Sequence, residues 1–397
     1  MKQADIKKRA ELAFPDAVEI RRHLHRHPEL SYQEHETTKF IINELDKLGI
    51  PVDRPLDTGC VGVIDGGKAG ERVIALRADI DALPIREEGD HKKDFISENT
   101  GVAHCCGHDG HTANLLGTAR ILSELKEDIE GRVLLVFQPG EEKLPGGGRM
   151  LCETGYLQDK GVDVIYGLHT SPAHDTGTIA LKPGYLMARP DEFDIEIIGK
   201  GGHAASPHLS TDPIVLAAQA VGQIQTIVSR DINPTEPAVV TIGKIAGGTA
   251  HNIIPEKVHL MGTVRTFSDE TARMIKSRIE AIVKGITESA GADYTFSFNF
   301  GYPAVDNSEW AAENVIDAGN ELLGKDRVIT MKDPLMAGED FAFYQQHFPG
   351  AFFFLGCGSD AADSRYSWHH PRYNIDEECL KTGMTLMASL VFKPVQV

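Results

Sequence analysis

The spacing of apolar residues along the chain predicts helices that alternate with short strands. The first 48 residues indicate two helices, the second of them at residues 33–48. In that second helix Phe40, Ile41 and Leu45 share one side, and Gly49 is a typical stop signal. Four apolar runs predict strands of a largely buried sheet, at residues 61–64, 72–76, 132–137 and 162–168.

From about Arg189 the pattern changes to that of a separate small domain. Phe193, Ile195 and Ile197 fall at every second position, as in a strand with one buried face. A helix, two strands, a helix and a strand are expected next, at residues 213–229, 238–242, 258–264, 269–289 and 294–298. This β-α-β-β-α-β order is the ferredoxin-like pattern. Helix–strand alternation resumes after about Tyr302, so we expect the chain to return to the first domain.

Length and composition agree with two globular domains. At 397 residues the chain exceeds what one hydrophobic core usually serves. A net charge of -18 argues against nucleic acid or an anionic membrane as partner, because either would need a basic face. The sequence has no long apolar span and no signal-like N-terminus, and its six cysteines lack the pattern of a small secreted domain. We therefore expect a cytoplasmic protein.

The run His-Cys-Cys-Gly-His-Asp-Gly-His at residues 104–111 is the strongest chemical signal in the chain. It holds five metal-competent side chains and a carboxylate, a density that packing does not require. Residues 112–122 have helical spacing, so this metal loop is expected at a helix N-terminus, where the dipole favours a thiolate.

Polar residues also follow the predicted strands. Asp79 and Asp81 come after one strand, the Glu141–Glu142 pair after the next, and His169 after a third. In open sheets flanked by helices, ligands bind beyond the carboxyl ends of the strands. These side chains are therefore expected at one edge, facing the metal loop, where the late pair His369–His370 can complete a site.

Such a set suits two divalent ions with a water held between them as nucleophile. Cys106 as thiolate is the candidate bridge, favoured over Cys105 because adjacent side chains cannot both point the same way. The candidate terminal ligands are His108 and His169 for one ion, and Glu142 and a late histidine for the other. Glu141 is then free to act as general base, and Asp79 or Asp81 to orient a ligand. The spacing alone does not choose between His369 and His370.

Structural roles are the alternative for some of these polar residues. His23, His25 and His27 would point in different directions on a helix, which favours capping, packing and solvent roles over metal binding. The Glu141–Glu142 pair would also suit the acid-rich first turn of a helix, but the nearby metal loop favours the catalytic interpretation.

Four motifs together resemble one family of enzymes, at residues 104–112, 138–142, 199–208 and 251–255. They are similar to the metallo-amidohydrolases of the hippurate hydrolase and auxin-conjugate (IAA-amino acid) hydrolase branch of the aminoacylase/carboxypeptidase superfamily. The resemblance covers essentially the full chain. It implies a three-layer α/β/α di-metal hydrolase domain of residues 1–188 and 301–397, with a ferredoxin-like lid and dimerisation domain of residues 189–300 inserted in it. A free edge strand of that lid would pair two copies, so we expect a homodimer.

The resemblance also assigns roles to single residues. The family's metal ligands fall on Cys106, His108, Glu142, His169 and His369, and its base falls on Glu141. The last ligand opens a His-x-Pro motif, which selects His369 over His370. In the lid, His203 is implied to stabilise the oxyanion, in its own or the partner's site. Asn252 and Arg265 are implied to hold the substrate carboxylate, a task that suits the planar fork of arginine.

The chain departs from the family pattern at two places. Cys105 stands where a small apolar residue is usual, and residues 143–148 differ from the commoner loop, which is expected to line the acyl pocket.

The leading hypothesis is hydrolysis of N-acyl-L-amino acids to a carboxylic acid and a free amino acid, with two ions of zinc or manganese, or else cobalt or nickel. The alternatives are a metallo-dipeptidase or carboxypeptidase on the same site, a thiol enzyme that uses Cys106, and a noncatalytic metal-binding protein.

Overall fold

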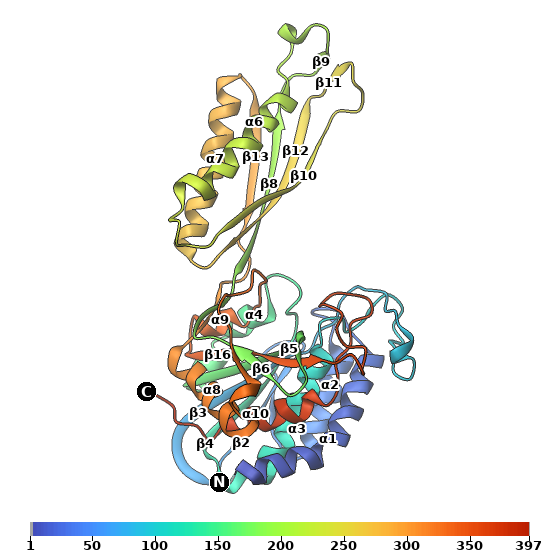
Figure 1. The fold of residues 1–397 in the computed structure, drawn as a ribbon, viewed down its shortest axis with the longest axis vertical. Coiled ribbons are helices and arrows are strands. Elements are labelled where there is room, and N and C mark those ends of the chain that lie inside the picture. The colour runs from blue at the N-terminus through green and yellow to red at the C-terminus, as the bar shows by residue number, and fades with distance from the viewer. Residues whose placement is uncertain (1–2, 397) are drawn as a thin grey trace. The chain divides into compact units, whose positions relative to one another are not determined.

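The computed structural model describes residues 3–396 and divides the chain into two compact units (Figure 1). The first unit comprises Met1–Leu186, Val305–Pro334 and Asp340–Val397, and the second comprises Met187–Ala304 and Leu335–Glu339. Residues 1, 2 and 397, part of the predicted catalytic domain, lie outside the described residues. The predicted lid, residues 189–300, falls within the longer segment of the second unit.

The first unit is built on an eight-stranded sheet in the order β1-β2-β4-β3-β5-β16-β6-β15. Its strands are β1 (Val52–Asp53), β2 (Cys60–Asp65), β3 (Lys68–Asp79), β4 (Glu130–Gln138), β5 (Val164–Asp175), β6 (Ile179–Leu181), β15 (Val328–Thr330) and β16 (Gly350–Gly358). The central strands β4, β3, β5 and β16 run parallel, while β2 is antiparallel to β4. The four predicted apolar runs correspond to β2, β3, β4 and β5.

Helices cover both faces of this sheet, which confirms the predicted α/β class. One face carries α1 (Gln3–Arg26), α2 (His35–Lys47), α3 (His108–Glu124), α8 (Glu309–Leu323) and α10 (Cys379–Leu390). The other carries α4 (Gly147–Glu153) and α9 (Ala342–Gln345), and α5 (Tyr156–Asp159) follows α4. Strand β16 shows the two-sided burial directly. Phe353 joins the large core under the long helices, whereas Phe352 packs against Phe341 with ring centroids 4.9 Å apart.

One strand extends further than its sequence pattern indicated. β5 keeps its pairing with β16 through Ser171, so His169 lies inside the strand and not beyond its end. The polar residues after Leu168 interrupt the apolar run but not the hydrogen-bond ladder.

The second unit has the predicted ferredoxin-like order. Its antiparallel sheet, β10-β12-β8-β13, consists of β8 (Arg189–Ile198), β10 (Val239–Gly247), β12 (Lys257–Thr266) and β13 (Asp293–Asn299). Its helices are α6 (Pro213–Thr226) and α7 (Asp269–Ser289), and each starts at a residue whose side chain accepts a backbone N–H, Asp212 or Ser268. The core lies between the helices and one face of the sheet, where Ile195 and Ile197 meet Ile275 and Ile279.

Two small sheets complete the strands: β9 (Gly202–His203) with β11 (Ile253–Ile254), and β7 (Gly184–Met187) with β14 (Val305–Asn307). Within residues 3–396, none of the helices has both the length and the apolar character needed to cross a lipid bilayer.

Candidate metal centre

The metal loop is built into the start of α3. This helix begins at His108, four residues before the expected start, so His108, Asp109 and His111 lie in its first turn. The side chains buried in this first turn are polar, so the spacing of apolar residues does not reveal that the helix has already begun. Gly107 precedes the helix with φ +97°, and a Cβ at this position would collide with the Thr170 hydroxyl. Only glycine allows the loop to approach β5 this closely.

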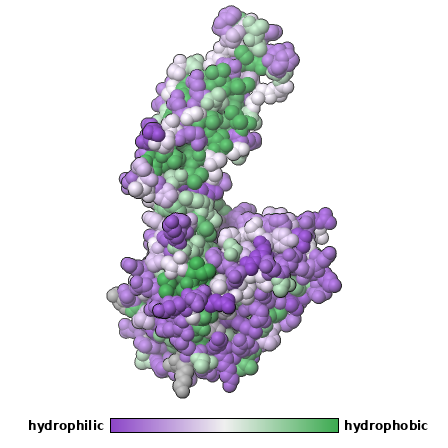
Figure 2. Space-filling view, in the orientation of Figure 1, coloured by the Kyte–Doolittle hydropathy of each residue, from purple (hydrophilic) through white to green (hydrophobic). Residues whose placement is uncertain are grey.

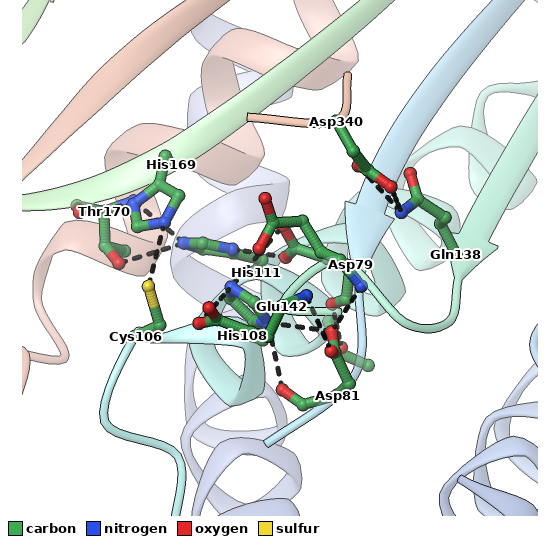
Figure 3. A network of polar contacts seen from close by, with 12 residues as sticks. Asp79, Asp81, Cys106, His108, His111, Gln138, Glu142, His169, Thr170 and Asp340 are labelled. Carbon is green, nitrogen blue, oxygen red and sulfur yellow. Dashed lines mark hydrogen bonds and ion pairs between the residues drawn. The ribbon is translucent and has the colours of Figure 1, made fainter. Parts of the chain in front are cut away.

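Two groups of potential ligands share Cys106. In the first group, labelled in Figure 3, its Sγ and the ring nitrogens of His108 and His169 lie within 4.8 Å of one another. A second group, with the same spread, joins Cys106 to Glu142 and His369. The separation is 3.4 Å from Cys106 Sγ to His169 Nε2, and 3.3 Å from His369 Nε2 to Glu142 Oε1. Five side chains from four distant segments of the first unit thus meet at one place.

Hydrogen bonds orient both buried histidines toward this place. His108 Nδ1 donates to the Asp81 carbonyl at 2.9 Å, and His169 Nδ1 donates to the Thr170 carbonyl at 2.8 Å. The Nε2 atom of each ring is left for the centre. Among the described residues, His108 Nε2 and Glu142 Oε1 are buried atoms without a hydrogen-bond partner. Buried polar atoms are rarely left unsatisfied, and cations bound at this place would satisfy both. The donor set of thiolate, imidazole and carboxylate fits divalent ions.

The electrostatics of the centre also favour a cation. Burial raises the pKa of the Cys106 thiol well above its usual range, and Glu142 and Glu141 add to this effect. Burial opposes the charge on His108, but the Asp79 and Asp81 carboxylates prevail and raise its pKa to about 10. The polypeptide alone thus holds excess negative potential here. A bound dication would offset it and deprotonate the thiol.

Asp81 connects the two halves of the centre. Its Oδ1 accepts from the Glu141 backbone N–H at 3.1 Å and lies 3.2 Å from His108 Nδ1. Its Oδ2 accepts from the Glu142 N–H at 3.0 Å and from the Ser31 hydroxyl at 2.6 Å. One carboxylate therefore orients a candidate ligand and also holds the backbone that carries both glutamates.

Asp79 acts through His111. Its Oδ1 accepts from His111 Nδ1 at 2.6 Å, and His111 Nε2 accepts from the Thr170 backbone N–H at 2.8 Å. Both ring nitrogens of His111 are thus hydrogen-bonded, and no lone pair is left for a metal ion. His111 instead connects Asp79 to the β5 backbone beside His169. Arg77 donates to Asp79 Oδ2 at 2.7 Å from the other side.

Glu141 lies in the same cluster and is buried. One of its oxygens lies within 4.8 Å of ligand atoms of His108 and Glu142. Residues 139–146 contain neither helix nor strand, so the first-turn interpretation of this glutamate pair is wrong.

Several supporting residues were missed from sequence. Beneath the metal loop, Arg21 Nε donates to Asp109 Oδ2 at 2.8 Å, and His25 Nδ1 contacts the same oxygen at 2.7 Å. His25 thus has a packing role, as expected, but as part of a buried charged network. An arginine and a histidine four residues apart on the inner face of α1 were the available signal. The indole N–H of Trp368 donates to the Thr170 carbonyl at 2.7 Å. No pattern in the sequence around Trp368 indicated this contact.

The three lid residues lie at two ends of the second unit, in which β9 and β11 are at one end of the long strands (Figure 1). His203 pairs with Ile253 across β9 and β11, and Ala204 N–H donates to the Asn252 carbonyl at 3.1 Å, so His203 and Asn252 are exposed neighbours. Arg265 lies near the far end of β12, half-buried, with its Nε donating to the Met336 carbonyl at 3.1 Å. The eight residue-to-residue steps of β12 from Lys257 to Arg265 span about 26 Å. One copy of this unit therefore does not bring His203 and Arg265 to the same small molecule.

Comparison with known proteins identifies the family. The model of peptidase family M20/M25/M40 matches residues 75–393. The chain belongs to this family. An N-acyl-L-amino acid amidohydrolase from Geobacillus stearothermophilus is 46% identical over 308 residues, 77% of this chain and 82% of its own length. An N-acetyl-L-cysteine deacetylase from Bacillus subtilis is 44% identical over 365 residues, 91% of this chain and 84% of its own.

A solved structure agrees with these relatives. The crystal structure of a dinuclear metal-binding M20 peptidase from Bacillus subtilis superposes with a TM-score of 0.81 at 36% identity, covering 96% of this chain and 98% of that one. The predicted resemblance, the catalytic domain with an inserted lid, and the activity class are confirmed: the M20 chain is a metal-dependent amidohydrolase. The family and this neighbour also support two divalent metal ions, which the donor set of the centre fits.

Proposed function

We propose that this M20 enzyme hydrolyses the amide bond of N-acyl-L-amino acids, with acetyl, benzoyl or a similar acyl group, and releases a carboxylic acid and a free amino acid. The observation that carries the proposal is the pair of ligand groups joined by Cys106. The names of the two amidohydrolase relatives support the substrate class.

In this proposal two divalent ions would be held by the two groups that share Cys106, one with His108 and His169 and the other with Glu142 and His369. Two divalent ions, when bound, supply Lewis acidity toward the amide carbonyl and lower the pKa of a water molecule. Thiolate and imidazole favour zinc, and the carboxylate also suits manganese, with cobalt or nickel as further options.

Glu141 is proposed as the proton carrier. Its carboxylate takes a proton from the attacking water and later gives it to the leaving amine. Asp81 supports this role because it holds the Glu141 backbone and orients His108 together. A buried position limits competing water around the carboxylate.

The lid residues are proposed to act on the substrate. His203 donates to the developing oxyanion, and Asn252 and Arg265 bind the substrate carboxylate, Arg265 through its planar fork. The separation of His203 from Arg265 along β12 supports a site that uses residues from two copies of the chain.

A homodimer through the second unit is proposed on the same grounds. β10 is an edge strand of its sheet, and exposed apolar residues lie on it and on the neighbouring α6: Ile245, Ile214 and Val215. Figure 2 shows apolar residues gathered over α6. An unpaired edge beside an apolar surface favours strand pairing with a second copy. The six cysteines, all free, support a reducing compartment and hence the cytoplasm.

The test is a substrate panel on metal-depleted protein with each divalent ion restored in turn. We expect turnover of benzoyl-glycine and acetyl-amino acids, lost on chelation and restored by metal. Faster turnover of free-amine dipeptides would favour the dipeptidase or carboxypeptidase alternative. Activity that survives thorough chelation would favour a thiol mechanism at Cys106.

A further inference from the structure

We propose that residues 31–34, here called the clamp segment, position the loop that carries Glu141 and Glu142 and thereby set the rate of hydrolysis. The proposal rests on the proposed function, in which Glu141 carries the proton. The loop in question, residues 139–146, joins β4 to α4 without a helix or strand of its own, and we call it the glutamate loop. Its shape therefore depends on what its backbone binds.

Three successive backbone N–H groups of the glutamate loop bind carboxylate oxygens from other segments. Gly140 donates to Glu34 Oε1 at 2.8 Å, and Glu141 and Glu142 donate to the two oxygens of Asp81 at 3.1 and 3.0 Å. Hydrogen bonds to an ionised acceptor are stronger than neutral ones. The acceptors Glu34 and Asp81 are themselves buried, so they hold the loop at fixed points.

The clamp segment also fixes Asp81 itself. The Ser31 hydroxyl donates to Asp81 Oδ2 at 2.6 Å. The backbone beside it is tied to the same place, because Ala82 N–H donates to the Glu29 carbonyl at 2.8 Å. Ser31 therefore reaches the two glutamates indirectly, through the carboxylate that binds their N–H groups.

Tyr32 makes the most specific contact. Its hydroxyl donates to the Lys143 carbonyl and accepts from the Gly146 N–H at 3.0 Å, so it closes the turn that follows the glutamates. Its ring lies against Gly140, where a Cβ would collide with it. Tyr32 adopts φ +67°, a left-handed conformation that L residues with a Cβ rarely take. Such residues persist where the surrounding contacts hold them, and they cluster at functional sites.

The consequence is a positioning role. Glu141 transfers a proton only from within hydrogen-bond reach of the water and the leaving nitrogen. A displacement of the glutamate loop by about 1 Å is enough to lower the rate by up to about a hundredfold. Tyr32 has no hydrogen bond to any of the five proposed metal ligands in the described chain, so its hydroxyl reaches Glu141 and the proposed ligand Glu142 only through the backbone of the glutamate loop.

The test compares Tyr32→Phe with Tyr156→Phe. Both tyrosines are partly buried in the first unit, and Tyr156 donates its hydroxyl to Asp53 Oδ2 at 2.6 Å, so the control loses a comparable hydrogen bond. We expect Tyr32→Phe to lower kcat at least about tenfold, with KM unchanged within about twofold, and Tyr156→Phe to leave both constants unchanged.

Ion affinity is measured separately by fluorescence. Trp368 lies 5.0 Å from the His169 ring between centroids, so its emission reports metal binding, and Trp310→Phe removes the second tryptophan. A kcat loss in Tyr32→Phe that persists at metal concentrations saturating for that variant, with the melting temperature unchanged, supports the clamp. Equal kcat values in the two variants at saturating metal, or a loss of kcat that only follows a loss of melting temperature, overturn it.

Glu141→Gln in the same assay separates the two proposals. If wild-type protein hydrolyses N-acyl amino acids and Glu141→Gln does not, the proposed function stands whatever Tyr32→Phe does. If no N-acyl amino acid is turned over, the proposed function fails, and the same tyrosine pair, measured on a free-amine dipeptide, still supports or overturns the clamp.

Discussion

The Asp81 carboxylate alone orients several groups of the metal centre. It faces donors from His108, Glu141, Glu142 and Ser31, and it is almost completely buried. Burial makes these four interactions strong, because water does not compete for the oxygens. It also makes them interdependent, since a change at one oxygen leaves a buried donor without an acceptor.

Asp81→Asn tests this dependence at nearly constant volume. The amide replaces one acceptor oxygen by an NH₂ group that faces N–H donors. We expect ion affinity and kcat/KM to fall by about 10- to 100-fold each, as is usual when a residue that orients a metal ligand is changed. The measurements are metal titration by Trp368 fluorescence and hydrolysis of an acetyl-amino acid. Asp65→Asn, at an exposed carboxylate paired with Arg132, is the matched control and should change neither. Wild-type values for Asp81→Asn would contradict the orienting role.

Helix α1 covers the sheet and also supports the metal loop through a buried arginine. Its inner face packs against α3 and α10, but it also carries Arg21, which is 1% exposed. The Arg21 guanidinium donates to Asp109 Oδ2 at 2.8 Å, to Glu377 Oε1 at 3.2 Å and to Asn374 Oδ1 at 3.0 Å. The helix thus ties the first turn of α3 to the segment before α10. The Asp109 carboxylate depends on this arginine, and the pKa of Asp109, despite the opposing effect of burial, is held well below its usual range by Arg21 and His25.

Arg21→Ala should therefore destabilise the first unit strongly, because it leaves the buried Asp109 charge without its main partner. Breaking a buried pair in this way costs about 3–5 kcal/mol. Arg22→Ala is the matched control next to it. Arg22 pairs with Glu377 at 2.7 Å from a partly exposed position, where an ion pair contributes about 1 kcal/mol or less. Denaturant unfolding of both variants measures the difference. Equal losses of unfolding free energy would contradict the role of α1 as an anchor of the metal loop.

The elements that could be predicted from sequence are those marked by a continuous apolar run or by burial that repeats with a period. The strands β2 to β5 are apolar runs. The helices α2, α6 and α7 and the alternating strand β8 show periodic burial. The first turn of α3 and the end of β5 do not, because buried polar residues replace the apolar ones there. Candidate ligands were recognisable by residue type, but Ser31, Tyr32 and Glu34 were not. Their contacts join residues that are 50 positions apart for Ser31 and Asp81 and 111 positions apart for Tyr32 and Lys143, and no local pattern encodes such a pairing.

At the scale of the whole molecule, the second unit has an unpaired strand edge and exposed polar residues that a second copy of the chain could contact. β10 presents an unpaired edge, and Ile245 on it is 56% exposed. At the same end of the unit as β9 and β11, His203 and Asn252 are exposed, and the length of β12 separates them from Arg265. If His203 and Arg265 both contact substrate, they do so most simply in different sites of a dimer. In that arrangement each active site would need residues from both subunits.

Mixing two inactive variants tests whether His203 acts in the partner's site. Glu141→Gln keeps His203, and His203→Ala keeps Glu141, so each pure variant should be inactive. In a mixed dimer, one site would combine an intact Glu141 with an intact His203 supplied by the other subunit. Random exchange makes about half of the dimers mixed, each with one complete site, so about a quarter of wild-type turnover should return. A control mixture with Ile245→Lys in both variants, which places charges on the β10 edge, should stay inactive and run as monomer in light scattering. If the first mixture stays inactive although mixed dimers form, His203 acts only within its own subunit.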